Sequence, residues 1–309
     1  MIKRTLYFTN PAYLSMEHAQ LVARIKNNQK RDEAEIPQLE EVRTIPIEDI
    51  GIIVLENRQI TLTTGLIAAL IDNNAAIVTC DAKQMPTGLI LPLSGNSVQN
   101  ERFRAQLDAS QPLRKQLWQQ TVSMKIANQC RILKQHTDAE CGCMEAWSKE
   151  VRSGDPMNLE ARAAAYYWKN LFLSIPNFVR DREGNYPNNF LNYGYAILRA
   201  IIARSLVGSG LLPTLGIHHQ NRYNAYCLAD DIMEPYRPYV DQLVIKLMKE
   251  YPGIEALNKE IKAKLLAIPT LDVVINGKRS PLMVAATTTT ASLAKCFTGE
   301  QRKIDYPEI

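Results

Sequence analysis

Short apolar runs separated by polar turns dominate the first 85 residues and predict a β-rich domain. Residues 3–9 are rich in Thr, Tyr and Phe and end at an Asn-Pro pair, which favours a strand followed by a turn. β-branched residues fill 45–47 and 50–55, and apolar and polar residues alternate over 60–63, as in a half-buried strand. The polar segment 27–33 is typical of a solvated hairpin tip.

Beyond position 100 the apolar residues recur mostly at helical spacing, so the larger part of the chain is predicted to be α-helical. Two prolines and two glycines between 86 and 95 suit a linker before it. We therefore expect an α+β protein: a β-rich domain over 1–85, a linker over 86–100, an α-helical domain over 101–300 and a flexible tail over 301–309. Helices are expected over 102–135, 159–173, 191–206, 231–250 and 287–297, with a strand pair around Asn276 and Gly277.

The composition excludes a wholly disordered chain, because 46% of the 309 residues are hydrophobic and 22% are charged. No apolar run approaches the roughly 20 residues of a membrane span, and the N-terminus lacks the apolar core of a signal peptide. We therefore expect a cytoplasmic protein with no membrane contact. The six cysteines are scattered, with only Cys141 and Cys143 close together, which fits reduced thiols better than a four-ligand zinc site.

The densest polar cluster lies between positions 216 and 235. His218 and His219 are adjacent, and Asp231 and Glu234 follow three residues apart, so that they share one face of a helix. Two carboxylates and an imidazole at one spot suit Mn²⁺ or Mg²⁺. The same acidic pair is also typical of the start of an ordinary helix, where the dipole favours negative charge.

Two further clusters stand earlier in the chain. Glu160 opens an Ala-rich helix that continues into aromatic residues, although an acidic residue at a helix N-terminus is common for structural reasons alone. Residues 189–195 place two asparagines and two tyrosines around Gly194, a pattern that also suits a helix cap followed by packing. Taken singly, each cluster leaves a structural and a functional interpretation open.

Taken in order, the clusters resemble the CRISPR-associated spacer-acquisition integrase, the universal Cas "one" protein. The resemblance rests on Glu160 in its Ala-rich helix, on the Asn-Tyr-Gly-Tyr segment at 192–195, and on the spacing from Gly216 to His219. It rests also on the Asp-Ile-Met-Glu-Pro-Tyr-Arg-Pro segment at 231–238. It covers nearly the whole chain, and the later motifs look most like those of members from type II systems.

This resemblance implies an N-terminal β-sandwich, a helical catalytic domain and a metal-dependent DNA endonuclease and integrase of antiviral defence. It assigns Glu160, His219 and Glu234 as catalytic residues and metal ligands, with Mg²⁺ or Mn²⁺ as the ion. Asp231 takes an acidic position beside them, as ligand or support, and the Gly-x-x-His spacing selects His219 over His218. Such a site would insert short foreign DNA fragments, the spacers, into a CRISPR array by attack of a 3′-hydroxyl on a phosphodiester.

DNA contacts are expected mainly in the helical part, because residues 1–85 carry 9 basic and 11 acidic side chains whereas the remainder carries 27 and 21. The candidates for phosphate contacts are Arg199, Arg204, Arg222 and Arg237, although isolated arginines are also common surface charges. Tyr13, after the first strand, is a candidate for stacking on the end of a duplex, or an ordinary turn tyrosine.

The resemblance also implies partners. These are double-stranded DNA (the prespacer and the CRISPR repeat), a second copy of the chain as a homodimer, and the Cas "two" subunit, which would join two integrase dimers in a heterohexamer. In type II systems they also include the effector nuclease and an accessory ring protein. Two alternatives remain open: a branched-DNA nuclease acting in repair, which would use the same residues, and a non-catalytic DNA-binding scaffold, which would need none of them.

Overall fold

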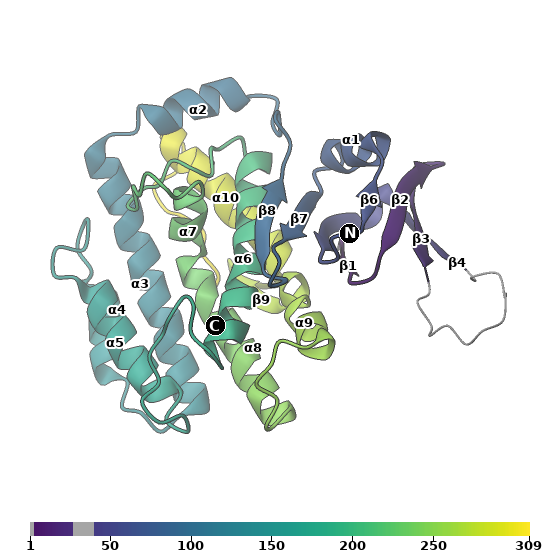
Figure 1. Ribbon diagram of the computed structural model, residues 1–309. Helices are drawn as coiled ribbons and strands as arrows, with labels where there is room; N and C mark the ends of the chain where they lie inside the picture. Colours follow the sequence, from purple (N-terminus) through teal and green to yellow (C-terminus); the bar gives the residue numbers. More distant parts are fainter. Residues whose placement is uncertain (1–2, 27–39) are drawn as a thin grey trace. The chain divides into compact units, whose positions relative to one another are not determined.

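The computed structural model describes residues 3–26 and 40–309 and divides into two compact units, with the boundary between Leu93 and Ser94. The first unit carries two β-sheets and the second is mainly helical (Figure 1). The expected α+β class is therefore confirmed. The expected hairpin tip at 27–33 lies outside the described residues.

The N-terminal unit consists of two four-stranded sheets. In the first, three strands run parallel and the fourth pairs antiparallel to them, in the order β1 (Arg4–Phe8), β5 (Ile50–Leu55), β7 (Ala76–Cys80) and β8 (Pro86–Ile90). The second has the order β4 (Glu40–Pro46), β3 (Gln20–Lys26), β2 (Ala12–Glu17) and β6 (Thr61–Leu62). The segment 86–100, expected as a linker, thus begins with a strand of the first sheet.

Both sheets contribute to one apolar core in this unit. Leu14 and Leu21 from the second sheet are buried with Ile53 and Ile77 from the first. Helix α1 (Thr64–Asp72) adds Leu66 and begins where the Thr63 hydroxyl accepts a hydrogen bond from the Leu66 amide at 3.3 Å. The β-branched runs of the sequence therefore become buried strands, and α1 adds its apolar side chains to their core.

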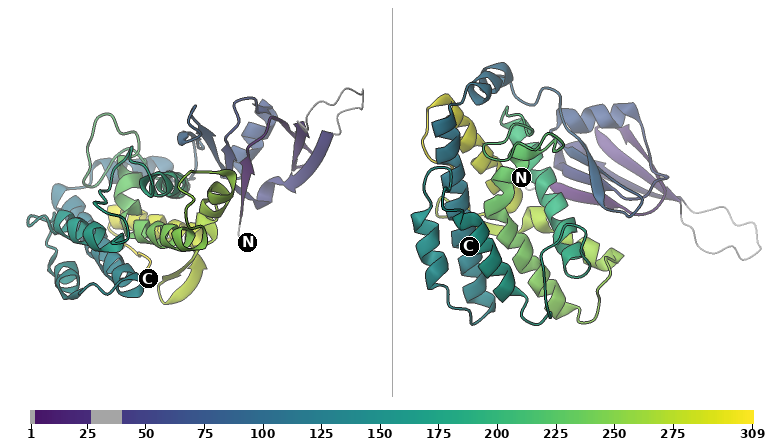
Figure 2. Two further views of the ribbon diagram at one scale, coloured as in Figure 1. Left: turned by 60° about the horizontal axis from the view of Figure 1, so that its bottom comes forward. Right: turned by 60° about the vertical axis from the view of Figure 1, so that its left-hand side comes forward.

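The C-terminal unit is built from nine helices longer than one turn and a short antiparallel strand pair within residues 94–309 (Figure 2). The first helices are α2 (Gln99–Leu107), α3 (Gln111–His136), α4 (Gly142–Glu150), α5 (Leu159–Leu171) and α6 (Asn188–Gly208). After them come α7 (Cys227–Met233), the 3₁₀ turn η2 (Glu234–Tyr236), α8 (Arg237–Glu250), α9 (Lys259–Leu265) and the 3₁₀ turn η3 (Ile268–Thr270). The chain ends with β9 (Asp272–Ile275), β10 (Lys278–Pro281) and α10 (Leu282–Thr298).

The helix expected over 102–135 is divided in the structure. It breaks after Asp108, and Ser110 starts α3 by accepting a hydrogen bond from the Leu113 amide at 3.3 Å. Pro112 follows in the first turn, where its missing N–H costs nothing. The helical spacing of the apolar residues continues across the break, which is why the sequence predicts one helix instead of two.

Helix α6 runs through the centre of this unit and is buried along most of its length. Gly194 allows a close approach to α8, because a Cβ atom there would lie 2.5 Å from Cγ1 of Val240. Helix α3 packs against α4 and α5, and α10 packs against α6 (Figure 1). The buried face of the long α3 therefore contacts α5 and also η2, the turn between α7 and α8.

Residues 301–309, expected as a flexible tail, lie against α3 and α10. The Tyr306 hydroxyl is 2.7 Å from that of Thr121, and the Thr289 hydroxyl donates to the Asp305 carbonyl at 2.6 Å. Tyr306 is only 6% exposed. In the described part of the chain, no helix is long and apolar enough to cross a membrane.

Candidate metal centre

Glu160 is held at the start of α5 by the loop before it. The two carboxylate oxygens of Asp155 accept hydrogen bonds from the amides of Leu159 and Glu160, each at 2.9 Å. Asn158 adopts a left-handed conformation with φ of 50°, which turns the chain into the helix. The carboxylate of Glu160 is therefore fixed at the positive end of α5, where negative charge is stabilised.

Glu234 occupies the 3₁₀ turn between α7 and α8 and is 5% exposed. Its Oε1 atom forms an ion pair with Nη2 of Arg237 at 3.0 Å, one helical turn later. Burial alone would raise the pKa of Glu234, but Arg237 and Lys125 hold that pKa below its usual range. The side chain is thus an ionised carboxylate inside the protein.

Lys125 of α3 connects the two glutamates. Its Nζ atom lies 2.6 Å from Oε1 of Glu160 and 2.6 Å from Oε2 of Glu234. Burial alone would lower the pKa of Lys125, but Glu234 and Glu160 raise it above its ordinary value. Two carboxylates from α5 and η2 therefore converge on one cation.

His219 is oriented by Asp231, whose side chain is completely buried. Its Nδ1 atom lies 2.5 Å from Oδ1 of Asp231, and Oδ2 accepts a hydrogen bond from the His218 amide at 2.9 Å. The loop approaches Asp231 so closely that a Cβ atom on Gly216 would lie 2.8 Å from Oδ2 and 2.2 Å from the His219 carbonyl oxygen. The His219 side chain is 46% exposed. The hydrogen bond to Asp231 raises the pKa of His219 against the opposing effect of partial desolvation, and the charges of Asp231, Glu234 and Glu160 raise it further.

His218 has a different environment. Its ring stacks on buried Trp118 of α3, with ring centroids 4.1 Å apart and planes within 1° of parallel. Burial lowers the pKa of His218, and neighbouring His219 adds to this effect. The two histidines of the motif are thus separated by structure: one is packed against an indole, and the other is paired with a carboxylate.

The donor set suits a hard divalent ion. Glu160 and Glu234 offer oxygens to a shared point, and the pairing of Nδ1 with Asp231 leaves Nε2 of His219 as the nitrogen for a metal. Among the described residues, no group of three or more His, Cys, Asp or Glu side chains is arranged to hold a metal ion as it stands. The ammonium of Lys125 occupies the point between the carboxylates instead.

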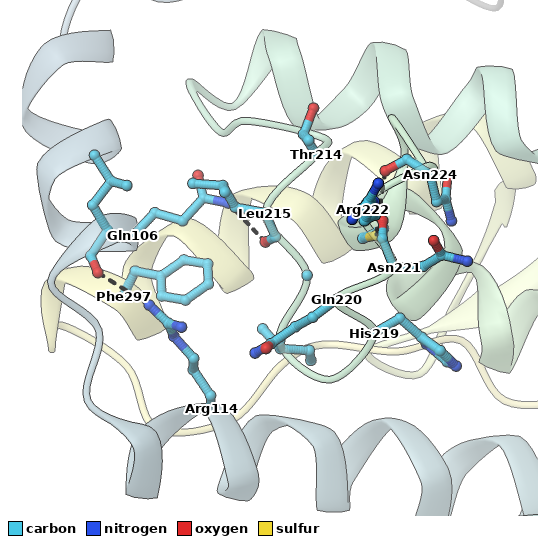
Figure 3. A pocket seen from close by; sticks show the side chains of 14 residues that line it. Gln106, Arg114, Thr214, Leu215, His219, Gln220, Asn221, Arg222, Asn224 and Phe297 are labelled. Carbon is cyan, nitrogen blue, oxygen red and sulfur yellow. Dashed lines mark hydrogen bonds between the residues drawn. The ribbon is translucent and has the colours of Figure 1, made fainter.

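A pocket of about 460 Å³ opens beside His219. Figure 3 shows the loop of His219, Asn221 and Arg222 on one side, with Gln106 of α2 and Arg114 of α3 on the other. Asn221, Arg222 and Arg114 can donate hydrogen bonds into this space from amide or guanidinium groups, whereas Gln106 already donates to the carbonyls of Leu212 and Leu215. The guanidinium and amide donors suit phosphate oxygens.

Two of the candidate DNA contacts lie at the surface of this unit. Arg222 is exposed, with its guanidinium 4.7 Å from the ring centroid of Tyr223. Arg199 of α6 keeps 43% of its side chain exposed, while its Nε atom lies 2.6 Å from Oδ1 of Asp230. The ion pair with Asp230 orients Arg199, and both guanidiniums have an accessible face.

The other candidates lie elsewhere. Arg204 is inside the unit, only 7% exposed, and burial lowers its pKa. Arg237 binds Glu234 and lies over the ring of Tyr195, with 4.9 Å to the centroid. Tyr13 is 44% exposed on β2 of the N-terminal unit. The geometry of Arg237 makes it part of the Glu234 environment.

Lys125 and Asp155 are the site residues that the sequence interpretation missed. Lys125 stands among the buried residues of α3, between Val122 and Ile126. A lysine on the buried face of a helix is rare unless it is paired with an acidic group. The position of Lys125 among apolar residues could therefore have indicated a buried ion pair. Asp155 gave none, because its role depends on the left-handed turn that follows it.

Comparison with known proteins identifies the family. The sequence model described as "CRISPR associated protein Cas1" matches residues 6–252. The chain belongs to the Cas1 family. A CRISPR-associated endonuclease Cas1 from Neisseria meningitidis is 35% identical over 311 residues, covering 100% of this chain and 97% of the relative. The expected family membership is therefore confirmed, and it makes the chain a member of an endonuclease family.

Solved structures support the fold of this Cas1 chain. A casposase bound to integration product has a TM-score of 0.78 at 20% identity, covering 99% of this chain and 93% of the other. A Cas6-RT-Cas1–Cas2 complex has a TM-score of 0.71 at 18% identity, covering 98% of this chain and 36% of the other. At these identities the similarity establishes the architecture alone.

Proposed function

We propose that this Cas1 chain is a spacer integrase. It joins the 3′-hydroxyl end of a short DNA duplex to a CRISPR repeat by transesterification. The observation that carries the proposal is the convergence of Glu160 and Glu234 on one cation, beside a histidine that Asp231 orients. Membership of an endonuclease family and the casposase-like fold agree with it.

Glu160, Glu234 and Nε2 of His219 would hold Mg²⁺ or Mn²⁺. When bound, such an ion lowers the pKa of an attacking hydroxyl and stabilises negative charge on the phosphoryl oxygens. Asp231 keeps the His219 proton on Nδ1 and supports the site without needing to be a ligand. Arg237 keeps Glu234 ionised and aimed at the site. No covalent nucleophile is required in this reaction.

DNA would be bound by the exposed guanidiniums beside the site. Arg222 and Arg199 are our candidates for phosphate contacts, and Tyr13 remains a candidate for stacking on a duplex end. We leave out Arg204 because it is buried, and Arg237 because Glu234 engages it. Affinity carried by several such contacts should fall steeply with added salt.

The assembly belongs to the proposal as well. We infer a homodimer that works with a Cas "two" subunit on prespacer and repeat DNA, since a Cas1–Cas2 complex is among the proteins of similar fold. Assignment to a type II system, with its effector nuclease and accessory ring protein, rests on the form of the 216–219 and 231–238 motifs. These partners define what a complete reaction mixture must contain.

A strand-joining assay tests the function. The protein, with and without the Cas "two" subunit, is incubated with a 3′-hydroxyl duplex and a supercoiled repeat-bearing plasmid in Mn²⁺. We expect covalent duplex–plasmid product, reduced at least roughly 100-fold in Glu160→Ala and His219→Ala and abolished by EDTA. Glu145→Gln is the matched control, because Glu145 pairs with Lys134 at the surface.

Each alternative has its own outcome in this assay. Metal-dependent nicking without joining, also lost in both variants, would favour the branched-DNA nuclease. DNA binding with neither nicking nor joining, even with the partner subunit present, would favour the scaffold.

A further inference from the structure

Lys125 lies where a metal ion would be expected from the ligands around it. Its ammonium is 2.6 Å from an oxygen of Glu160 and 2.6 Å from an oxygen of Glu234, and only 9% of its side chain is exposed. It makes a hydrogen bond to Glu160 and an ion pair with Glu234. Both contacts are held by the charge of the ammonium, which another cation can replace.

The balance of charge explains why a cation is needed there. Arg237 binds the other oxygen of Glu234, and Asp231 is paired with His219, so these groups are already engaged. Lys125 is the cation that Glu160 and Glu234 share. Two nearby carboxylates, one of them fully buried, repel each other and lose hydration, which makes them costly without a counter-ion.

We propose that Lys125 is the resident counter-cation of the metal centre, and that a divalent ion binds by displacing its ammonium from Glu160 and Glu234. The inference rests on the proposed function, which assigns these two carboxylates to the ion. A lysine suits such an exchange, because its ammonium is a point charge on a flexible four-carbon stem. The backbone of α3 can stay in place while the ammonium moves away.

Two consequences follow from this exchange. Lys125 stabilises the metal-free fold, since it prevents two carboxylates from facing each other without a cation. It also weakens metal binding, because each binding event must break its two ion pairs. A neutral side chain of similar length at position 125 should therefore have opposite effects on the stability of the metal-free protein and on its affinity for the ion.

The first experiment measures Mn²⁺ affinity by isothermal titration calorimetry and thermal melting in EDTA and in Mn²⁺. We expect Lys125→Met to bind Mn²⁺ about tenfold or more tightly than the wild type. It should also melt at a lower temperature in EDTA and gain more from Mn²⁺. Lys125→Arg keeps the positive charge, so it should not show the tighter Mn²⁺ binding expected of Lys125→Met. Lys134→Met is the matched control on the same helix, because Lys134 pairs with Glu145 at the surface.

A double variant tests the charge balance without any metal. In EDTA, Lys125→Met combined with Glu160→Gln removes one positive and one negative charge, so we expect it to melt above Lys125→Met alone. This comparison remains informative if Lys125→Met folds poorly, because the second substitution should restore folding. Stability losses that simply add would show that Lys125 is not the counter-ion of Glu160.

The outcomes separate this inference from the function on which it rests. Unchanged or weaker Mn²⁺ affinity in folded Lys125→Met, with binding still lost in Glu160→Gln, overturns the exchange but leaves the metal site. Absence of Mn²⁺ binding in every variant and in the wild type overturns the metal site itself. Mn²⁺ binding that is tighter in Lys125→Met than in the wild type, and unchanged in Lys134→Met, supports the exchange.

Discussion

Nδ1 of His219 lies 2.5 Å from Oδ1 of Asp231, a carboxylate with no exposed surface. A carboxylate accepts only, so this pairing holds a proton on Nδ1, and in the neutral imidazole Nε2 is then the nitrogen that carries no proton. Carboxylate–histidine pairs of this kind orient metal ligands in many proteins. Asp231 therefore determines which ring nitrogen of His219 is offered to the site.

Asp231→Asn should weaken Mn²⁺ binding by about 10- to 100-fold. The amide of asparagine can donate to Nδ1, which moves the imidazole proton to Nε2 and blocks the metal-binding nitrogen. Isothermal titration with Mn²⁺ measures the loss. Asp230→Asn is the matched control, because Asp230 pairs with Arg199 and not with a histidine. Equal affinities in the two variants would contradict the orienting role of Asp231.

Buried Asn128 links the C-terminal segment to the turn that carries Glu234. Its Nδ2 donates to the carbonyls of Pro235 at 2.9 Å and Pro307 at 3.0 Å, and its Oδ1 accepts from Arg131 at 3.1 Å and from the Ile309 amide at 3.2 Å. Of the twenty side chains, only an amide can donate twice and accept twice in this way.

Asn128→Leu should lower the free energy of unfolding by about 3 kcal/mol, because it leaves several buried polar groups unpaired. Urea denaturation measures this value. Removal of residues 307–309 takes away two of the four partners, so the same substitution should cost less in the shortened chain. Additive losses in the two backgrounds would mean that the segment does not depend on Asn128.

Glu160 and Glu234, two of the residues that the motifs single out, converge in the structure, but they do so on Lys125, which no motif contains. Glu160, His219 and Glu234 stand out by their order and spacing, whereas Lys125 looks like one polar residue on a long amphipathic helix. Sequence spacing reports neighbours within one element. A contact between positions 125 and 234 depends on the packing of α3 against η2, which local patterns do not encode.

The fold class was predictable because it depends on local patterns within each element. The packing of the C-terminal segment was not predictable, because it depends on contacts with distant parts of the chain. β-branched runs and helical spacing report local structure, and they separate a strand-rich part from a helical part. The polar composition of residues 301–309 predicts a flexible tail, yet Ile304 and Tyr306 are buried. Tyr306 bonds Thr121 of α3, which lies far upstream in the sequence. Thr121, which bonds Tyr306, and Asn128, which bonds Pro307 and Ile309, are polar side chains on a buried face. Neither carries a signal that a distant segment covers it.

Asp155 should contribute to both stability and metal binding, because its carboxylate accepts hydrogen bonds from the amides of Leu159 and Glu160. Asp155→Ala should lower the free energy of unfolding by about 1 kcal/mol and also weaken Mn²⁺ binding, since Glu160 loses its fixed position. Ser110→Ala removes the comparable cap of α3 and should cost similar stability without changing Mn²⁺ affinity. Equal effects of both variants on Mn²⁺ affinity would contradict a specific role for Asp155.

Asp241 of α8 gives the protein a pH-dependent stability that can be isolated. Its side chain is 1% exposed and accepts hydrogen bonds from Tyr195 at 2.5 Å and Tyr167 at 2.9 Å. Burial raises the pKa of Asp241 to about 6, and these two hydrogen bonds and the nearby Arg180 and Arg237 only partly oppose that rise. In the unfolded chain the group titrates near its ordinary value of about 4.

Between about pH 4 and pH 6 the folded protein therefore holds a proton on Asp241 that the unfolded chain has lost. Stability from this group is complete below pH 4 and falls as the pH rises through 6, by about 3 kcal/mol in total. Asp241→Asn cannot ionise at this position, so it lacks this pH-dependent contribution to stability. Urea denaturation from pH 4 to pH 7 should show the wild type losing about 3 kcal/mol relative to this variant. A constant difference across that range would mean that Asp241 ionises with an ordinary pKa despite its burial.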